Sequence, residues 1–382
     1  MRRTLFTEDH ESFRKVVAQF MADHAVPHFQ QWEEQGYVDR SFFKGMAELG
    51  VMGMAIPEEF GGSGVDDYRY NLIVQEEASK ALVALGPLRL QLDVILPYFL
   101  EYTNEEQKKR WLPGLASGDL LTAIAMSEPG TGSDLAGVRT NAVRDGDHYV
   151  LNGAKTFITG GWMADLTIVI CRTSVDPDNR RNGLTLLVVE DGMPGYEKGK
   201  KLQKIGLKSQ DTVELSFTDV RVPVENVLGE EGKAFGYLGH NLAQERLTIA
   251  VGSVASARAA LQITLDYVKE RELFGQHLAD FQNTKFELAA VATEVEAAQT
   301  LLDRAIEDHV DKVLDPAGAA MTKLFTTEVQ ARVVDRCLQL FGGYGYVYEY
   351  PIARLYADAR VARIYGGTSE VMKTIISKSL GL

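Results

Sequence analysis

The stretch Leu166-Thr167-Ile168-Val169-Ile170 is a continuous apolar run of strand length near the middle of the chain. Asn152-Gly153 precedes it between two β-branched and aromatic runs, and this dipeptide predicts a hairpin turn. Further strand-like runs follow at residues 184–189 and, with clean alternation, at 213–217. Short strands with no helical pattern between them indicate an antiparallel sandwich or barrel, which we place at residues 123–235.

The segments on either side of these strands follow a helical period instead. In residues 1–122, apolar side chains recur at helical spacing. In residues 236–382, a seam typical of a helix bundle alternates spacings of three and four. Its members are Leu288, Val291, Val295, Ala298 and Leu302. The sequence therefore predicts an α+β fold with an N-terminal α-helical domain, a middle antiparallel β-domain and a C-terminal four-helix bundle.

Composition excludes several classes of protein. The 382 residues carry a formal net charge of −13, which disfavours a nucleic-acid binder because neutralising phosphates requires a basic face. The two cysteines, Cys171 and Cys337, lie far apart in sequence and indicate no disulfide framework, as in a reducing compartment. No run of 18 or more apolar residues occurs, so we expect no membrane span and a cytoplasmic protein.

Several common catalytic motifs are absent from the sequence. The seven histidines form no HExxH pair or other metal-ligand spacing, and no GxSxG motif occurs. Gly62-Ser63-Gly64 and Gly343-Tyr344-Gly345 lack the third glycine of a dinucleotide fingerprint. We therefore expect no metal site, and any nucleotide cofactor must bind outside the Rossmann scheme.

The turn that opens the middle segment reads Ala125-Met126-Ser127-Glu128-Pro129-Gly130-Thr131-Gly132-Ser133-Asp134. Its composition suits a solvated turn, but it also exposes N–H groups and hydroxyls to a planar ligand. It closely resembles the first signature of the acyl-CoA dehydrogenase family. Other segments resemble that family's motifs, in its order: Pro57-Glu58-Glu59-Phe60-Gly61-Gly62, Arg271-Glu272-Leu273-Phe274-Gly275 with Phe281-Gln282, Gln339-Leu340-Phe341-Gly342-Gly343-Tyr344-Gly345, and Ile364-Tyr365-Gly366-Gly367-Thr368-Ser369-Glu370.

The resemblance implies FAD as cofactor and assigns its contacts residue by residue. The ring and its linker would meet Met126, Ser127, Gly132, Ser133, Phe157, Ile158 and Thr159. A neighbouring subunit's FAD would meet Arg271, Phe274, Gln282, Gln339, Gly342 and Gly343, while Thr368 and Glu370 would complete the site. Family members often carry Trp where Phe157 stands, which keeps the aromatic contact and loses the indole N–H. Taken alone, Arg271 also suits a surface ion pair, and Thr368 or Ser369 a helix N-cap.

The general base is the point at which the chain departs from much of the family. The resemblance places a Glu at the position of Gly366, and glycine cannot accept a proton. Glu245 shares a predicted apolar helix face with Leu242 and Ile249, so burial would raise its pKa, although a buried ion pair fits the same spacing. Long-chain and isovaleryl-type members carry Gly or Ala in the usual position and place the base before an Arg. Glu245-Arg246 and Gly366-Gly367 match that pattern, which assigns Arg246, Gly367 and Ser133 to the substrate.

The resemblance thus implies an FAD-dependent acyl-CoA dehydrogenase that forms trans-2-enoyl-CoA in fatty-acid or branched acyl-CoA catabolism. It also implies electron-transferring flavoprotein as acceptor and a homotetramer built as a dimer of dimers. Two alternatives stay open: an acyl-CoA oxidase or flavin monooxygenase on the same fold, and a low-activity subunit of a heteromeric dehydrogenase. Residues 88–93 are expected to line the tail end of the acyl pocket, and chain length is not fixed by the sequence.

Overall fold

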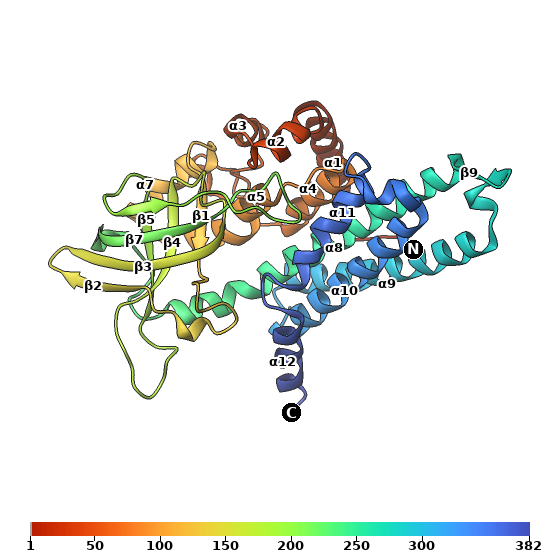
Figure 1. Ribbon diagram of the computed structural model, residues 1–382. Helices are drawn as coiled ribbons and strands as arrows, with labels where there is room; N and C mark the ends of the chain where they lie inside the picture. The colour runs from red at the N-terminus through yellow and green to blue at the C-terminus, as the bar shows by residue number, and fades with distance from the viewer. Residues whose placement is uncertain (1) are drawn as a thin grey trace.

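The computed structural model describes residues 2–382, with the sheet at one end of the molecule and the long C-terminal helices extending away from it (Figure 1). The N-terminal helices are α1 Glu8–Phe20, α2 Phe29–Gln35, α3 Arg40–Glu48, α4 Tyr68–Lys80, α5 Gly86–Arg89, α6 Leu96–Tyr102 and α7 Glu105–Ala116. A π-helical segment, Leu90–Ile95, joins α5 to α6. Because that segment and α6 pack against helix α8 (Ala234–Glu270), the N-terminal helices reach the middle of the C-terminal helices.

The middle segment forms an eight-stranded sheet in the order β6-β7-β3-β2-β4-β5-β8, with β1 paired to β4. The strands are β1 Thr122–Ala125, β2 Asn141–Asp145, β3 His148–Thr159, β4 Leu166–Arg172, β5 Leu184–Glu190, β6 Tyr196–Lys198, β7 Thr212–Pro223 and β8 Val227–Leu228. Both β1 and β2 run parallel to β4, so the sheet is mixed rather than antiparallel throughout. The direction in which a strand joins a sheet depends on its non-local connection, which a local pattern does not contain.

The predicted hairpin turn at Asn152-Gly153 is wrong. Both residues lie inside the long strand β3, and the turn between β2 and β3 falls instead around Gly146, whose φ is +64°. Pairing with β7 shifts register between Leu151 and Gly153, which marks a β-bulge. A Cβ at Gly153 would lie 2.5 Å from the Thr140 Oγ1, so close packing as well as a positive φ requires glycine there.

Strands β4 and β5 pack the sheet against the N-terminal helices. Both are buried on both faces. Ile168 and Ile170 pack in one apolar cluster with helix residues that include Trp111, whereas Val169 packs in another with strands β3 and β7. Each fully buried aliphatic side chain contributes about 1.5–3 kcal/mol, so this double burial fixes the sheet against the N-terminal helices.

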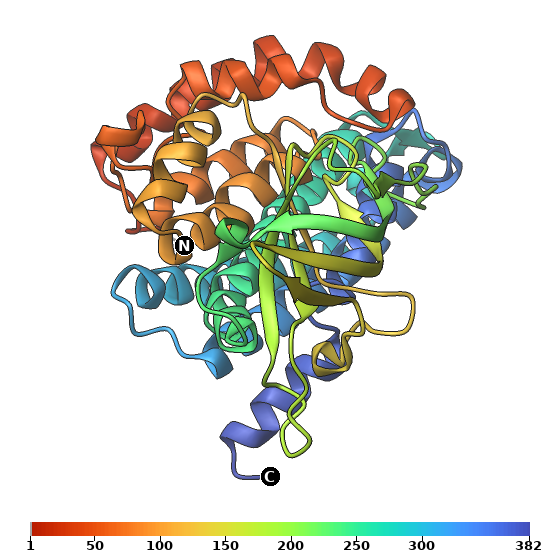
Figure 2. The ribbon, with the colours of Figure 1, turned by 90° about the vertical axis from the view of Figure 1, so that its left-hand side faces the viewer.

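The C-terminal helices are α8, α9 Gln282–Val310, α10 Pro316–Phe341, α11 Pro351–Ala359 and α12 Ser369–Ser379. The five predicted seam residues of α9 are all buried, which confirms the bundle pattern. A short hairpin, β9 Glu272–Leu273 with β10 Gln276–His277, joins α8 to α9. Figure 2 shows the sheet in front, with the N-terminal helices above it and α12 below.

Helix α8 alone within residues 2–382 has the length and apolar composition that a membrane span requires. Most of its apolar window is buried, and the helix packs against α4, α9 and α10. Burial against these helices accounts for its apolar composition.

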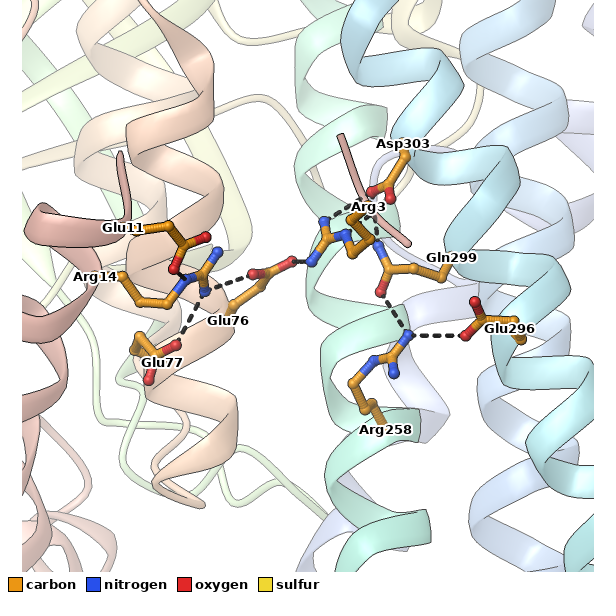
Figure 3. Close-up of polar contacts among 9 residues, drawn as sticks. All are labelled: Arg3, Glu11, Arg14, Glu76, Glu77, Arg258, Glu296, Gln299 and Asp303. Atoms are coloured by element: carbon orange, nitrogen blue, oxygen red, sulfur yellow. Dashed lines mark hydrogen bonds and ion pairs between the residues drawn. The ribbon is translucent and has the colours of Figure 1, made fainter. Parts of the chain in front are cut away.

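An ion-pair network fastens the N-terminal segment to both groups of helices (Figure 3). Arg3 donates to Asp303 of α9 at 2.7 and 2.8 Å and to Glu76 of α4 at 2.8 Å. Arg14 of α1 donates to Glu76 at 2.7 Å and to Glu77 at 3.0 Å. Since the carboxylates of α4 receive cations from two segments, the network holds α1, α4 and α9 together.

Candidate active site

Two adjacent charged residues, one acidic and one basic, are buried in the N-terminal half of helix α8. Glu245 is 7% exposed and Arg246 6% exposed. Glu245 shares its face with Leu238 and Ile249, both buried, so the apolar face predicted from the sequence is confirmed. A carboxylate held there by a long, well-packed helix has little freedom to turn to water.

The surroundings of Glu245 make its carboxylate a base near neutral pH. Burial raises the pKa of Glu245 from 4.5 to about 7, opposed by a hydrogen bond from Tyr98 and by the charge of Arg246. The Tyr98 hydroxyl donates to Oε1 of Glu245 at 3.0 Å across 147 residues of sequence. Within residues 2–382, no Lys, Arg or His nitrogen lies within salt-bridge distance of this carboxylate. The buried ion pair that the spacing also allowed is therefore not formed.

The turn at Gly366-Gly367 lies against the next turn of α8. Gly366 has φ +62° and Gly367 has φ +93°, a conformation that L side chains rarely adopt. A Cβ at Gly366 would come 2.2 Å from Cδ1 of Ile249, four residues after Glu245. Ile249 thus occupies the space in which a side chain at 366 would begin, so a carboxylate at that position requires the Ile249 side chain to move as well as a positive φ at residue 366.

Lys323 of α10 ties that turn to the helix bundle. Its fully buried ammonium donates to the carbonyl oxygen of Gly367 at 2.8 Å. Burial and the charge of Arg246 lower the pKa of Lys323 to about 8. Because a charged donor bonds this carbonyl, the peptide of Gly367 has a defined orientation. Sequence reasoning missed both Lys323 and Tyr98, since neither differs by pattern from its core neighbours.

A buried carboxylate anchors the glycine-rich turn that follows β1. Glu128 accepts Lys155 Nζ at 2.9 Å and the backbone N–H groups of Arg139 and Thr140 at 2.8 and 2.9 Å. These bonds and the charge of Lys155 lower the pKa of Glu128 despite its burial. The turn is consequently rigid at Glu128, while nothing lies within 4 Å of a Cβ at Gly132. The structure thus presents an open, pre-formed cradle of backbone and hydroxyl groups.

Strand β3 borders this cradle. Lys155 Nζ donates to the Met126 carbonyl at 3.1 Å, and the Thr156 N–H donates to the Ser127 carbonyl at 3.0 Å. The next residue, Phe157, is 69% exposed and has φ +59°. An exposed aromatic ring held by a strained backbone beside an open glycine turn fits a planar aromatic cofactor such as a flavin.

The other predicted contacts in this region have mixed surroundings. Ile158 is buried in the sheet core, and the Thr159 hydroxyl lies 3.3 Å from Nε2 of Gln210. Ser133 is exposed on the cradle. The Thr368 hydroxyl accepts the N–H of Val371 and caps α12, so the N-cap interpretation is confirmed, and Glu370 is exposed in the first turn of that helix.

A second group of predicted residues gathers at the far end of the helices. The guanidinium of Arg271 lies over the Tyr344 ring at 5.5 Å, which brings the end of α8 beside the turn after α10. Phe274 is 89% exposed with φ +51°, and open space surrounds Cβ positions at Gly342 and Gly343. Gln282 and Gln339 are exposed in the same region. Figure 1 shows β9 at the opposite end of the molecule from the sheet, so the two groups cannot meet one flavin within a single chain.

Comparison with known proteins agrees with this arrangement. Sequence profiles described as the acyl-CoA dehydrogenase N-terminal, middle and C-terminal domains match residues 7–119, 123–220 and 232–381. The chain belongs to the acyl-CoA dehydrogenase family. It is accordingly an FAD-dependent oxidoreductase, as its motifs predict.

Individual relatives support the same conclusion for this acyl-CoA dehydrogenase. The long-chain specific acyl-CoA dehydrogenase, mitochondrial, of Sus scrofa is 43% identical over 378 residues, covering 99% of this chain and 88% of that protein. A crystal structure of acyl-CoA dehydrogenase from Geobacillus kaustophilus has a TM-score of 0.98 and 44% identity, covering 100% of both chains. A glutaryl-CoA dehydrogenase from Mycobacterium smegmatis, in complex with FADH2, has a TM-score of 0.90 and 28% identity, covering 98% of this chain and 95% of that one.

Described residues offer no competing metal centre. Among residues 2–382, no group of three or more His, Cys, Asp or Glu side chains could hold a metal ion. The two cysteines are free and buried, and burial raises the pKa of Cys171 to about 12, so that thiol is inert at neutral pH.

Proposed function

We propose that this acyl-CoA dehydrogenase oxidises an acyl-CoA thioester to its trans-2-enoyl product with Glu245 as the general base. The observation that carries the proposal is a buried carboxylate with a pKa of about 7 and no salt bridge to any of residues 2–382, one helical turn from Ile249 and the Gly366 turn. A base with a pKa near the working pH combines a deprotonated fraction with a strong tendency to take a proton. FAD, when bound, supplies the acceptor for the hydride that leaves Cβ.

Four further residues serve the acyl-CoA in this proposal, three by contact and Lys323 through the Gly367 peptide. The backbone N–H of Gly367 donates to the thioester carbonyl oxygen and so acidifies the α-proton, as an oxyanion hole does. Lys323 supports this role because it bonds the carbonyl of the same residue. Arg246 has an Nε without a partner among residues 2–382, and we assign it, with Ser133, to orienting the acyl-CoA.

We also propose the flavin contacts implied by the family motifs, divided between two subunits. Met126, Ser127, Gly132, Ser133, Phe157, Ile158, Thr159, Thr368 and Glu370 serve the chain's own FAD. The residues around Arg271 serve the FAD of a neighbouring subunit, where a fixed cation suits the pyrophosphate. The strongly exposed Phe274 and Tyr346 support a covered interface at that end.

The wider setting follows the family. We place domain boundaries after residues 122 and 235, and we propose a homotetramer in the cytoplasm that passes electrons to an electron-transferring flavoprotein. Light scattering of the flavin-loaded protein tests the assembly. A monomer that still holds FAD would contradict the shared site.

The test of function is reduction of the bound flavin by acyl-CoA under nitrogen, followed by admission of air. A dehydrogenase bleaches with substrate and reoxidises slowly in air, but quickly with an electron-transferring flavoprotein. Rapid reoxidation with peroxide formation would favour the oxidase alternative. A colourless protein that takes up no FAD would favour a low-activity subunit, although the exposed Phe157 and the open cradle speak against it.

A further inference from the structure

A cavity lies beyond Glu245, between α4, α5, α8, α10 and α11. Its lining includes Gln75 of α4, Arg89 of α5, Gly252 and Ser256 of α8, and Gln330 of α10. Tyr365, directly before the Gly366-Gly367 turn, also lines it. The cavity therefore begins where the proposed thioester site ends and continues into the helical part of the molecule.

The geometry of α8 gives the distance from the base. Gly252 follows Glu245 by seven residues, so it lies on the same helix face about 10 Å further along the axis. A Cβ at Gly252 would come 3.0 Å from the Nη1 of Arg89 and 3.7 Å from the Oε1 of Gln75. The absence of a side chain there leaves room for two polar groups to face the helix at the depth of an acyl tail.

Polar atoms without partners line this cavity. Oε1 of Gln75, Oε1 of Gln330 and Oγ of Ser256 are buried and have no hydrogen-bond partner within residues 2–382. Gln75 and Gln330 are only 9% and 5% exposed. Burying such an atom unpaired costs about 1–3 kcal/mol, so a wholly hydrocarbon tail would leave several groups unsatisfied.

The charged groups of the cavity already have partners. Asp93 accepts the amides of Asn71 at 2.6 Å and Gln75 at 2.5 Å. Arg89 donates to the Tyr365 hydroxyl at 3.1 Å and lies 5.4 Å from the centre of that ring. A carboxylate on the acyl tail would face the Asp93 carboxylate and two amide oxygens, all of them acceptors, and the positive charge of Arg89 beside them already balances that of Asp93. A hydroxyl can donate to an amide oxygen and accept from an N–H or a hydroxyl.

We propose that this cavity selects acyl-CoA substrates whose chain carries a hydroxyl group at or near its distal end. The inference rests on the proposed function, because it assumes that the thioester lies at Glu245. Within the cavity, the substrate hydroxyl donates to the Oε1 of Gln330 or Gln75 and accepts from Ser256 or from the free amide N–H of Gln330. A hydroxyl-bearing tail of the right length bonds both an acceptor and a donor of the cavity, whereas an unsubstituted tail bonds neither.

The experiment compares binding and turnover for the flavin-loaded protein. Acyl-CoA thioesters of graded length, each with a terminal hydroxyl, are titrated calorimetrically against their unsubstituted counterparts. Titration of Glu245→Gln protein measures affinity without turnover, and kcat/KM is measured with unchanged protein. At the best-matched length, we expect the hydroxyl to improve affinity by about tenfold.

Substitutions then locate the effect. Gln330→Leu keeps most of the side-chain volume and removes the amide, so the hydroxyl preference is expected to fall to near unity. Ser256→Ala gives a second, smaller change if Gln330→Leu fails to fold. Gln262→Leu is the matched control, because Gln262 lies on the exposed face of α8 and bonds Asp266.

The outcomes separate this inference from the proposed function. Bleaching by unsubstituted acyl-CoAs with no hydroxyl preference at any length would overturn the inference and leave the function standing. A preference that persists in Gln330→Leu and Ser256→Ala would also overturn it. Tighter binding of hydroxyacyl-CoAs with no bleaching by any thioester would support the cavity assignment and overturn the function.

Discussion

Tyr98→Phe should shift the pH dependence of catalysis without displacing the residues of the active site. The Tyr98 hydroxyl donates to Glu245 at 3.0 Å, and burial holds the pKa of Tyr98 well above 10, so it stays a donor through the working range. This bond favours the charged carboxylate. A hydrogen bond to a charged group is worth about 1.5–3 kcal/mol, and 1.36 kcal/mol is one pKa unit, so its loss should raise the pKa of Glu245 by roughly one to two units.

The assay is kcat/KM from about pH 5 to pH 10, because its acid limb reports the free enzyme's base. The unchanged protein should lose activity below a midpoint near 7, the pKa of Glu245. In Tyr98→Phe the midpoint should rise by roughly one to two units, with activity recovering at higher pH. Tyr102→Phe is the control, since Tyr102 lies one turn later on the same helix and stacks on Tyr237. An unmoved limb in Tyr98→Phe, or an equal shift in both variants, would refute the reasoning.

Three other predictions follow from the same site. Glu245→Gln should stabilise the flavin-free fold by up to about 3 kcal/mol at pH 8 and should have no such effect below pH 4.5. The reason is that a carboxyl with a raised pKa contributes stability that is lost as the pH rises from 4.5 through about 7. Equal shifts of the melting temperature at both pH values would contradict this. Gly366→Glu in the Glu245→Gln background should restore turnover only when Ile249→Ala is added, since Cδ1 of Ile249 lies 2.2 Å from the new Cβ; rescue without the second change would show that the clash is unimportant. Lys323→Met should leave the flavin content unchanged and lower kcat/KM by about 1.5–3 kcal/mol, mostly through kcat, because the Gly367 peptide loses its charged partner. A change in KM alone would assign Lys323 to ground-state binding.

Local patterns were sufficient for the order of helices and strands. The 3.6-residue seam of α9 and the alternation at 213–217 each report which side of an element is buried, and both are buried as expected. The Asn152-Gly153 prediction failed for a physical reason. The same φ freedom that suits a two-residue hairpin also suits a bulge, and only contact with Thr140 from another strand decides between them.

Only part of the environment of Glu245, the candidate base, could be predicted from the sequence. The apolar face of α8 indicated that Glu245 would be buried, but an ion pair fitted the spacing equally well. The decision depends on Tyr98, 147 residues away, and on the absence of a cation within salt-bridge distance in the described part of the chain. Of the segment 88–93 expected at the tail end of the pocket, Leu88, Arg89, Leu92 and Asp93 do line the cavity. Its unpaired polar atoms could not be predicted, because Gln75, Ser256 and Gln330 come from three helices whose packing no local pattern encodes.

The central claim is that Glu245 removes the α-proton. The most direct measurement is stopped-flow reduction of the bound flavin by acyl-CoA in Glu245→Gln, with Glu101→Gln, a partly exposed carboxylate on α6, as the control. The account predicts yellow, folded Glu245→Gln protein whose reduction rate falls by about 10²–10⁴-fold, and an ordinary rate for the control. Full-speed reduction in Glu245→Gln would show that another group takes the proton.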